Sequence, residues 1–132
     1  MNILIFGAGA IGCHIGHCLY TAGHHVTLIC RGQHYAQMKQ YGMCISIRDN
    51  DLVAPDEVVK EGPRFEILDS LDKITVSELD CIFITLKLND YNSETLGPLT
   101  KWFGETTAII PPCTKLPFWW FYNLPGEKNQ KY

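Results

Sequence analysis

Residues 3–12 read I-L-I-F-G-A-G-A-I-G, and this stretch decides the fold. It places Gly7, Gly9 and Gly12 at G-x-G-x-x-G spacing between an apolar, strand-like segment and a helix-like one. In a dinucleotide-binding fold the first glycine permits a tight turn, the second lets the backbone approach a pyrophosphate, and the third lets the helix pack closely on the sheet. The amino end of that helix would then face the phosphates. The stretch predicts a Rossmann-type α/β fold that binds a dinucleotide.

Length and composition limit the classes of protein to which the chain can belong. Its 132 residues suit a single domain, and 11 Lys plus Arg against 14 Asp plus Glu leave no broad basic surface for nucleic acid or an anionic membrane. The six cysteines show no C-x-x-C pair, which favours reduced thiols in a cytoplasm. The first apolar run is too short for a signal peptide or a membrane span. We expect a soluble, cytoplasmic protein.

The first half of the chain predicts a β-α-β unit. Residues 2–6 form a buried strand, residues 10–22 a helix that Gly23 ends, and residues 25–30 a second strand. On the helix, one set of apolar residues falls at helical spacing and predicts the buried face: Ile11, Ile15, Cys18, Leu19 and Ala22. Three polar residues are expected on another face: His14, His17 and Thr21.

The remaining elements complete a doubly wound, mostly parallel sheet. A short helix is expected over residues 33–41, closed by Gly42, and residues 43–48 predict a third strand at an edge of the sheet. Further strands are predicted at residues 52–53, 58–59, 65–68, 81–86 and 107–110, with a helix within residues 91–103.

Prolines and aromatic residues gather after Ile110 and indicate a change in organisation. We expect one Rossmann domain over residues 1–117, followed by an aromatic and polar tail over residues 118–132. The five aromatic residues 118–122, which include Trp119 and Trp120, cannot all face water comfortably. They predict a contact surface and a homodimer.

The residues that follow two strands bear on the choice of ligand. An acidic residue that binds the ribose 2′-hydroxyl of NAD is expected at the end of the second strand, but the sequence reads Cys30-Arg31. An arginine there can pair with a 2′-phosphate, so NADP(H) is favoured over NAD; the alternative is a solvated surface arginine. Lys87 follows the strand at residues 81–86 and could reach substrate or cofactor, although it could equally be an exposed charge. Asn89 and Asp90 lie in the same loop and are weaker candidates for such a contact.

No catalytic or metal cluster is predicted. Cys13 with His17, and His14 with Cys18, lie four residues apart on the first helix, but no remote partner completes a set of three or four ligands. The alternative is a core cysteine with surface histidines. No Ser-His-Asp order, P-loop or nucleic-acid motif stands out.

Taken together, these motifs resemble the amino-terminal NADP-binding domain of the ketopantoate reductase (2-dehydropantoate 2-reductase) family. The resemblance covers the glycine-rich start, A-G-H-H-V-T-L-I-C-R-G-Q-H at residues 22–34, I-T-L-K at residues 84–87, and the proline-rich stretch after the last strand. It implies hydride transfer from NADPH to a 2-oxo acid such as ketopantoate, in pantothenate biosynthesis. It places Lys87 near the nicotinamide ribose and the substrate. The cofactor-binding residues that it implies are Gly7, Ala8, Gly9, Ala10, Ile11, Gly12, Arg31, Leu86, Lys87 and Thr114.

The chain departs from the family pattern in two places. The family commonly carries an Asn-Gly pair after the last strand of this region, where this chain has Thr114-Lys115. The family's helical carboxyl-terminal domain, which supplies a general-acid lysine and most substrate-binding groups, has no counterpart in 132 residues. We therefore expect a cofactor-binding domain that is inactive by itself, with residues 118–132 as the start of a missing domain. The alternatives are a non-catalytic NADP-binding module or pseudoenzyme that acts through self-association, and an interaction protein that has lost the ligand.

Overall fold

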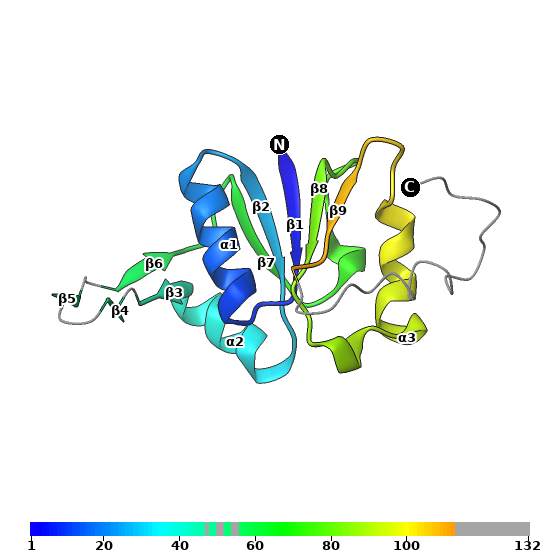
Figure 1. Ribbon diagram of the computed structural model, residues 1–132. Helices are drawn as coiled ribbons and strands as arrows, with labels where there is room; N and C mark the ends of the chain where they lie inside the picture. Colours follow the sequence, from blue (N-terminus) through cyan, green and yellow to red (C-terminus); the bar gives the residue numbers. More distant parts are fainter. Residues whose placement is uncertain (47, 50–51, 54–55, 113–132) are drawn as a thin grey trace.

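The centre of the molecule is a five-stranded sheet. The computed structural model describes residues 1–46, 48–49, 52–53 and 56–112. The strand order is β7-β2-β1-β8-β9, and every pairing in this sheet is parallel (Figure 1). The strands are β1 (Asn2–Phe6), β2 (His25–Ile29), β7 (Phe65–Leu68), β8 (Cys81–Ile84) and β9 (Ala108–Ile110). The predicted doubly wound α/β fold is confirmed.

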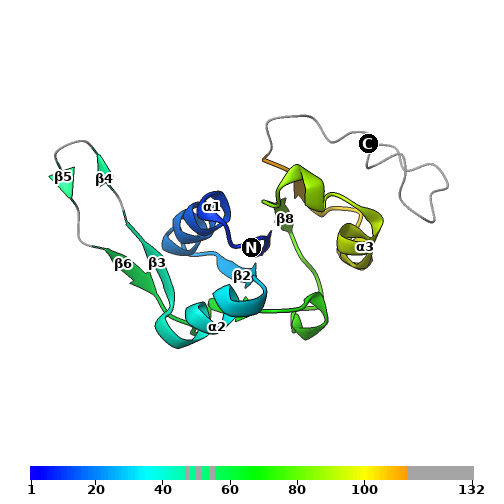
Figure 2. The ribbon, with the colours of Figure 1, turned by 90° about the horizontal axis from the view of Figure 1, so that it is seen from below.

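Helices cover both faces of the sheet, as Figure 2 shows from below. One face carries α1 (Ala10–Thr21) and α2 (Gly32–Tyr41). The other carries α3 (Ser93–Leu96) and three short 3-10 helices, η1 (Leu71–Lys73), η2 (Leu88–Asp90) and η3 (Gly97–Trp102). The predicted helix within residues 91–103 is therefore present as α3 followed by η3. Pro98 lies in the first turn of η3, and a proline cannot continue an α-helical hydrogen-bond ladder because it has no N–H.

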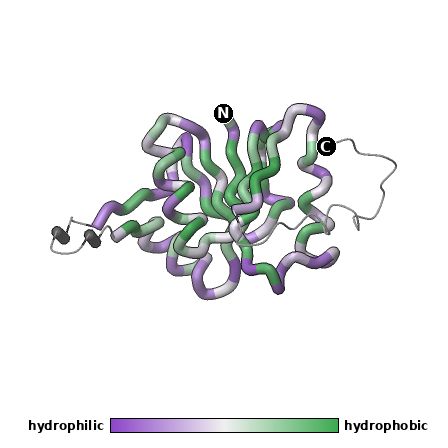
Figure 3. The backbone as a smooth tube through the Cα atoms, viewed as in Figure 1, coloured by the Kyte–Doolittle hydropathy of each residue, from purple (hydrophilic) through white to green (hydrophobic). Residues whose placement is uncertain are grey.

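Each face of the sheet has its own apolar core, and strand alternation explains the division. Ile3 and Ile5 point to the face covered by α1 and α2, whereas Leu4 and Phe6 point to the face covered by α3. All four are almost fully buried. The central strands are accordingly the most continuously apolar part of the backbone trace in Figure 3. A parallel sheet covered on both faces requires this pattern.

The buried face of α1 agrees only in part with the predicted one. Ile15 and Leu19 pack against the core as predicted, but the most buried residues of the helix are small or polar, namely Gly12, Cys13, Gly16 and His17. Ile11, which was predicted to be buried, is 59% exposed, and Cys18 and Ala22 are exposed as well. Close packing accounts for Gly12, because a Cβ there would lie 2.0 Å from the Gly7 oxygen. The first turn of the helix therefore has room only for glycine at this position.

An antiparallel arm extends from the body beside α1 (Figures 1 and 2). It pairs β3 (Met43–Ile45) with β6 (Glu57–Val59), and β4 (Arg48–Asp49) with β5 (Leu52–Val53). The prediction that residues 43–48 form an edge strand of the main sheet is therefore wrong, because β7 occupies that edge.

The arm is attached to the body by apolar and polar contacts. Met43, Ile45 and Val59 join the core beneath α1. His17 Nε2 lies 2.6 Å from Glu57 Oε2, so that this histidine is buried against the arm, whereas it was predicted to lie on a polar face.

Several predictions concern residues beyond Pro112 or general properties of the chain. The boundary at residue 117, the aromatic residues 118–122 and Thr114 all lie outside the described residues. Within the described part of the chain, no helix has the length and apolar character needed to cross a lipid bilayer.

Candidate dinucleotide-binding site

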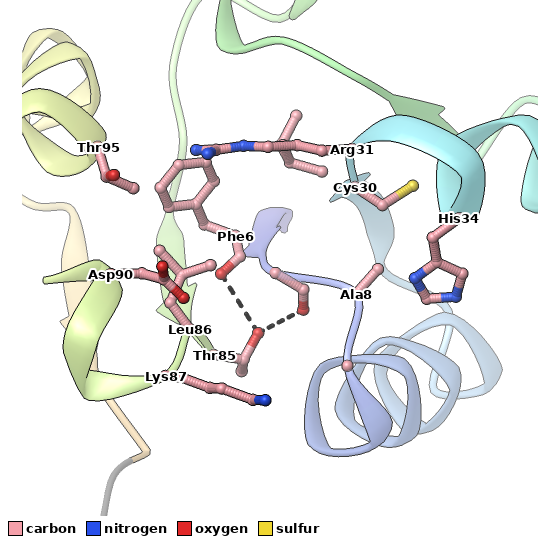
Figure 4. Close-up of a pocket in the computed structure, with 13 residues that line it drawn as sticks. Phe6, Ala8, Cys30, Arg31, His34, Thr85, Leu86, Lys87, Asp90 and Thr95 are labelled. Carbon is pink, nitrogen blue, oxygen red and sulfur yellow. Dashed lines mark hydrogen bonds between the residues drawn. The ribbon is translucent and has the colours of Figure 1, made fainter.

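A cleft of about 420 Å³ opens at the carboxyl ends of β1, β2 and β8. The strand order reverses between β1 and β8, because β2 and β7 continue to one side of β1 and β9 lies to the other side of β8. In open α/β sheets, such a reversal is the point at which ligands bind. The cleft is lined by Phe6, Gly7, Ala8, Gly9, Ile29, Cys30, Arg31, His34, Thr85, Leu86, Lys87, Asp90 and Thr95 (Figure 4).

The glycine-rich turn forms the floor of this cleft. The backbone geometry explains why positions 7 and 12 are occupied by glycine. Gly7 has a φ of 122°, which L side chains rarely adopt, and its N–H donates to the Ile29 carbonyl at 3.2 Å. A Cβ on Gly12 would lie 2.0 Å from the Gly7 oxygen. At Gly9, by contrast, a Cβ would meet no protein atom within 4 Å. The turn is therefore closed on the protein side and open at Gly9.

The start of α1 is suited to an anion. Gly9 is the N-cap, no side chain caps the helix, and its first turn contains no acidic residue. The partial positive charge of the free N–H groups at a helix start is then left uncompensated by the protein. Such an end attracts phosphate groups.

Two cationic side chains lie on opposite sides of the cleft in Figure 4. Arg31, the N-cap of α2, extends across Phe6 with its guanidinium carbon 5.8 Å from the ring centroid. It also borders a smaller hollow of about 190 Å³, whose lining includes Leu71 and Pro98. Lys87 follows β8 and is exposed. An anionic ligand placed along the cleft could contact a cation at either end.

A buried thiol also lines the cleft. Burial raises the pKa of Cys30 to about 11, and it raises the pKa of the neighbouring Cys13 to about 11 as well. Since only the thiolate is a good nucleophile, Cys30 is in its inert protonated form near neutral pH. The thiol therefore contributes packing to the cleft.

We expect Cys30 to resist alkylation at pH 8, where a pKa of about 11 leaves roughly one thiolate in a thousand. The exposed residues Cys18 and Cys44 should react with iodoacetamide first. Labelling of Cys30 should increase as the pH rises towards 11, because the thiolate form is gained in that range. Peptide mass spectrometry after timed labelling measures each rate, with urea-denatured protein as the control. Equal rates for Cys30 and Cys44 in the folded protein would contradict this prediction.

The structure brings most of the predicted site residues together. Gly7, Ala8, Gly9, Arg31, Leu86 and Lys87 all line the cleft. Ala10, Ile11 and Gly12 form the first turn of α1 directly after the turn, with Gly12 buried beneath it. Thr114 lies outside the described residues.

Three polar lining residues were given no role, or little weight, by the sequence. His34 comes from the first turn of α2, Thr85 follows β8, and Thr95 comes from α3. Thr85 lies directly after β8 and two residues before Lys87, and this position could have indicated that it lines the cleft. His34 and Thr95 line the cleft because α2 and α3 pack beside it, and the local sequence gives no sign of this packing. Asp90, to which the sequence gave less weight than to Lys87, also lines the cleft.

A metal centre has no support in the part of the chain that the structure describes. There, no three or more His, Cys, Asp or Glu side chains converge in a way that could hold an ion. His14 and Cys18 do approach each other, with Nε2 and Sγ 3.8 Å apart on the exposed side of α1.

Comparison with known proteins places the cleft in a family context. The chain is 25% identical over 128 residues to a 2-dehydropantoate 2-reductase of Mesorhizobium japonicum, which covers 96% of this chain and 35% of that protein. A PanE/ApbA family ketopantoate reductase from Ralstonia eutropha superposes with a TM-score of 0.62 at 25% identity, over 83% of this chain and 33% of that one. A D-mandelate dehydrogenase in ternary complex with NADH and anilino(oxo)acetate superposes with a TM-score of 0.60 at 22% identity, over 83% of this chain and 32% of that one.

The chain thus spans about a third of the length of the relatives that it matches. A family model described as ketopantoate reductase PanE/ApbA matches residues 3–111, which include every described strand and helix apart from Asn2, the first residue of β1. The chain belongs to the ketopantoate reductase PanE/ApbA family.

Proposed function

We propose that this chain is the NADP(H)-binding domain of a 2-dehydropantoate 2-reductase-like oxidoreductase. The observation that carries the proposal is the cleft at the strand-order reversal, whose glycine-rich floor is open at Gly9 and whose two sides each present a cation. A dinucleotide has phosphates in its middle and a nucleoside at each end, and the cleft has matching features in the same order.

The Arg31 side of the cleft would bind the adenosine half. Arg31 and His34 lie at the start of α2, and the first turn of that helix contains no acidic residue. An acidic residue there would repel a 2′-phosphate, whereas a guanidinium can bind it through several N–H donors. The other cofactor type occurs on the same fold, since the D-mandelate dehydrogenase complex contains NADH. Arg31 is therefore the residue on which the preference for NADP(H) depends.

The Lys87 side would face the nicotinamide and the substrate. NADPH, when bound, supplies the hydride for reduction of a 2-oxo acid such as ketopantoate. In this chain, Leu86 would pack against the cofactor and Lys87 would place a positive charge near the substrate carboxylate. These residues orient and bind, and the described cleft presents no further group to which we assign proton transfer.

The remaining features of the proposal concern the cellular setting. The five described cysteines are unpaired, which supports the reducing, cytoplasmic location expected from the sequence. Residues 118–122 are proposed to mediate a homodimer. The 132 residues assayed by themselves should bind NADPH without measurable reduction of ketopantoate.

Calorimetric titration with NADPH and NADH tests the proposed function. We expect NADPH to bind at least tenfold more tightly, because a charge-assisted phosphate contact contributes roughly 1.5 to 3 kcal/mol. Equal affinities would contradict the preference for NADP(H) but not the dinucleotide site. Failure of both cofactors to bind at millimolar concentration would overturn the proposed function. NADPH oxidation with ketopantoate present would instead show that the chain catalyses the reaction by itself.

A further inference from the structure

Thr85, which no prediction singled out, holds the glycine-rich turn from the side of β8. Its backbone N–H donates to the Phe6 carbonyl at 3.0 Å. Its hydroxyl lies 2.6 Å from the Gly7 oxygen and 3.3 Å from the Phe6 oxygen (Figure 4). A hydroxyl has one proton to donate, and the shorter distance identifies the Gly7 carbonyl as its main acceptor. The residue thus connects the end of β8 directly to the turn after β1.

The Gly7 carbonyl is enclosed on a second side by α1. A Cβ built on Gly12 would lie 2.0 Å from the Gly7 oxygen and 2.6 Å from Thr85 Oγ1. The carbonyl, the hydroxyl and the first turn of the helix therefore meet at one point on the protein side of the turn. Helix packing leaves the carbonyl little room, and the hydroxyl supplies the hydrogen bond that a half-buried carbonyl needs.

The direction of this carbonyl also determines the direction of the next amide. The described chain has no cis peptide bond, and in a trans peptide the C=O and N–H groups point in opposite directions. With the Gly7 carbonyl aimed at Thr85, the Ala8 N–H is aimed away from Thr85. Ala8 and Gly9 both line the cleft. This hydrogen bond thereby orients the peptide planes that the ligand would meet in the cleft.

We propose that Thr85 is a positioning residue for dinucleotide binding, whose hydroxyl orients the glycine-rich turn towards the pyrophosphate. This inference rests on the proposed function. Thr85 would act through the backbone of Gly7 and Ala8. Loss of its hydroxyl should weaken every ligand that contains the pyrophosphate, whether or not that ligand carries a 2′-phosphate. A ligand without the pyrophosphate should be unaffected.

The test compares Thr85→Val, which removes the hydroxyl at nearly constant volume, with Thr85→Ser, which retains it. The matched control is Thr107→Val, because Thr107 Oγ1 also donates to a backbone carbonyl, that of Leu79, at 2.8 Å. Thr107 lies before β9, at the end of the sheet away from the cleft. Dissociation constants for NADPH, NADH and adenosine 2′-monophosphate are measured at 25 °C, and the thermal midpoint of each variant is recorded without ligand.

We expect Thr85→Val to weaken NADPH and NADH alike by roughly five- to tenfold, the usual effect of one hydrogen bond. Adenosine 2′-monophosphate should bind as to the unchanged protein, and Thr85→Ser should restore NADPH affinity to within about twofold. Thr107→Val should lower the thermal midpoint without changing any dissociation constant. If Thr85→Val does not fold, Thr85→Ala, which also lacks the hydroxyl, is measured against Thr85→Ser in the same way.

Unchanged NADPH affinity in folded Thr85→Val or Thr85→Ala would overturn the inference, even if the thermal midpoint fell. Equal weakening of adenosine 2′-monophosphate would overturn it too, since that result indicates general damage to the cleft. Both outcomes differ from failure of the proposed function, in which the unchanged protein itself binds neither dinucleotide.

Discussion

Gly12→Ala should destabilise the fold and abolish dinucleotide binding, which is the largest effect expected of any single substitution in the cleft. The added methyl would lie 2.0 Å from the Gly7 oxygen and 2.6 Å from Thr85 Oγ1. Overpacking commonly costs about 1 to 3 kcal/mol, and a collision with backbone falls at or above the top of that range. Because α1 must move away from the turn, the free N–H groups at its start would move with it. Urea unfolding measures the loss of stability, and calorimetry with NADPH measures the loss of binding.

Gly9→Ala is the matched control for that experiment. Gly9 has a φ of −76°, which alanine accepts, and its new Cβ would meet no protein atom within 4 Å. The free energy of unfolding should stay within about 0.5 kcal/mol of the original. NADPH affinity should still fall, because the methyl enters the space proposed for the pyrophosphate. Full stability in Gly12→Ala, or unchanged affinity in a folded Gly9→Ala, would contradict the proposed geometry of the turn.

Arg31→Ala should weaken NADPH by about 10- to 150-fold, the equivalent of losing one charge-assisted contact of roughly 1.5 to 3 kcal/mol. NADH lacks the 2′-phosphate, so its affinity should change by no more than a few-fold. The selectivity of the protein for NADPH should therefore disappear. Raising the salt concentration should weaken NADPH more in the original protein than in the variant, because an exposed charge contact is screened.

Arg64→Ala controls for the removal of one positive charge and one arginine–aromatic contact. Arg64 lies over the Tyr20 ring, with its guanidinium carbon 4.9 Å from the ring centroid, much as Arg31 lies over Phe6. It does not line the cleft. Its replacement should leave both cofactor affinities unchanged. Equal losses of NADPH and NADH in Arg31→Ala would show that Arg31 supports the cleft without reading the 2′-phosphate.

The fold could be predicted where local sequence and tertiary position agree. The β1-α1-β2 unit begins with an apolar run, has glycines at its turns and ends in branched residues, and each of these signals is local. The strands β7, β8 and β9 were predicted at or within one or two residues of their bounds for the same reason. The β3–β6 arm was misplaced because a three-residue strand carries no information about which sheet it joins.

The site could be predicted as far as strand ends identify it. Arg31 and Lys87 lie two and three residues after the ends of β2 and β8, and parallel strands bring their carboxyl ends to one edge, so both were expected there. Thr95 lines the cleft because α3 docks against the opposite face of the sheet, which no local pattern reports. The face of α1 was predicted only in part, because apolar periodicity identifies Ile15 and Leu19 but gives no sign that Gly12 is buried against the glycine-rich turn.

The central place of β1 in the sheet has a consequence for biosynthesis. Its partner on one side, β2, begins at residue 25, but its partner on the other side, β8, begins only at residue 81. Until the ribosome has released that segment, β1 has an unpaired edge and an uncovered apolar surface formed by Leu4 and Phe6. Unpaired strand edges of this kind favour aggregation of nascent chains. The nascent chain is therefore expected to be most prone to such aggregation before β8 has left the ribosome.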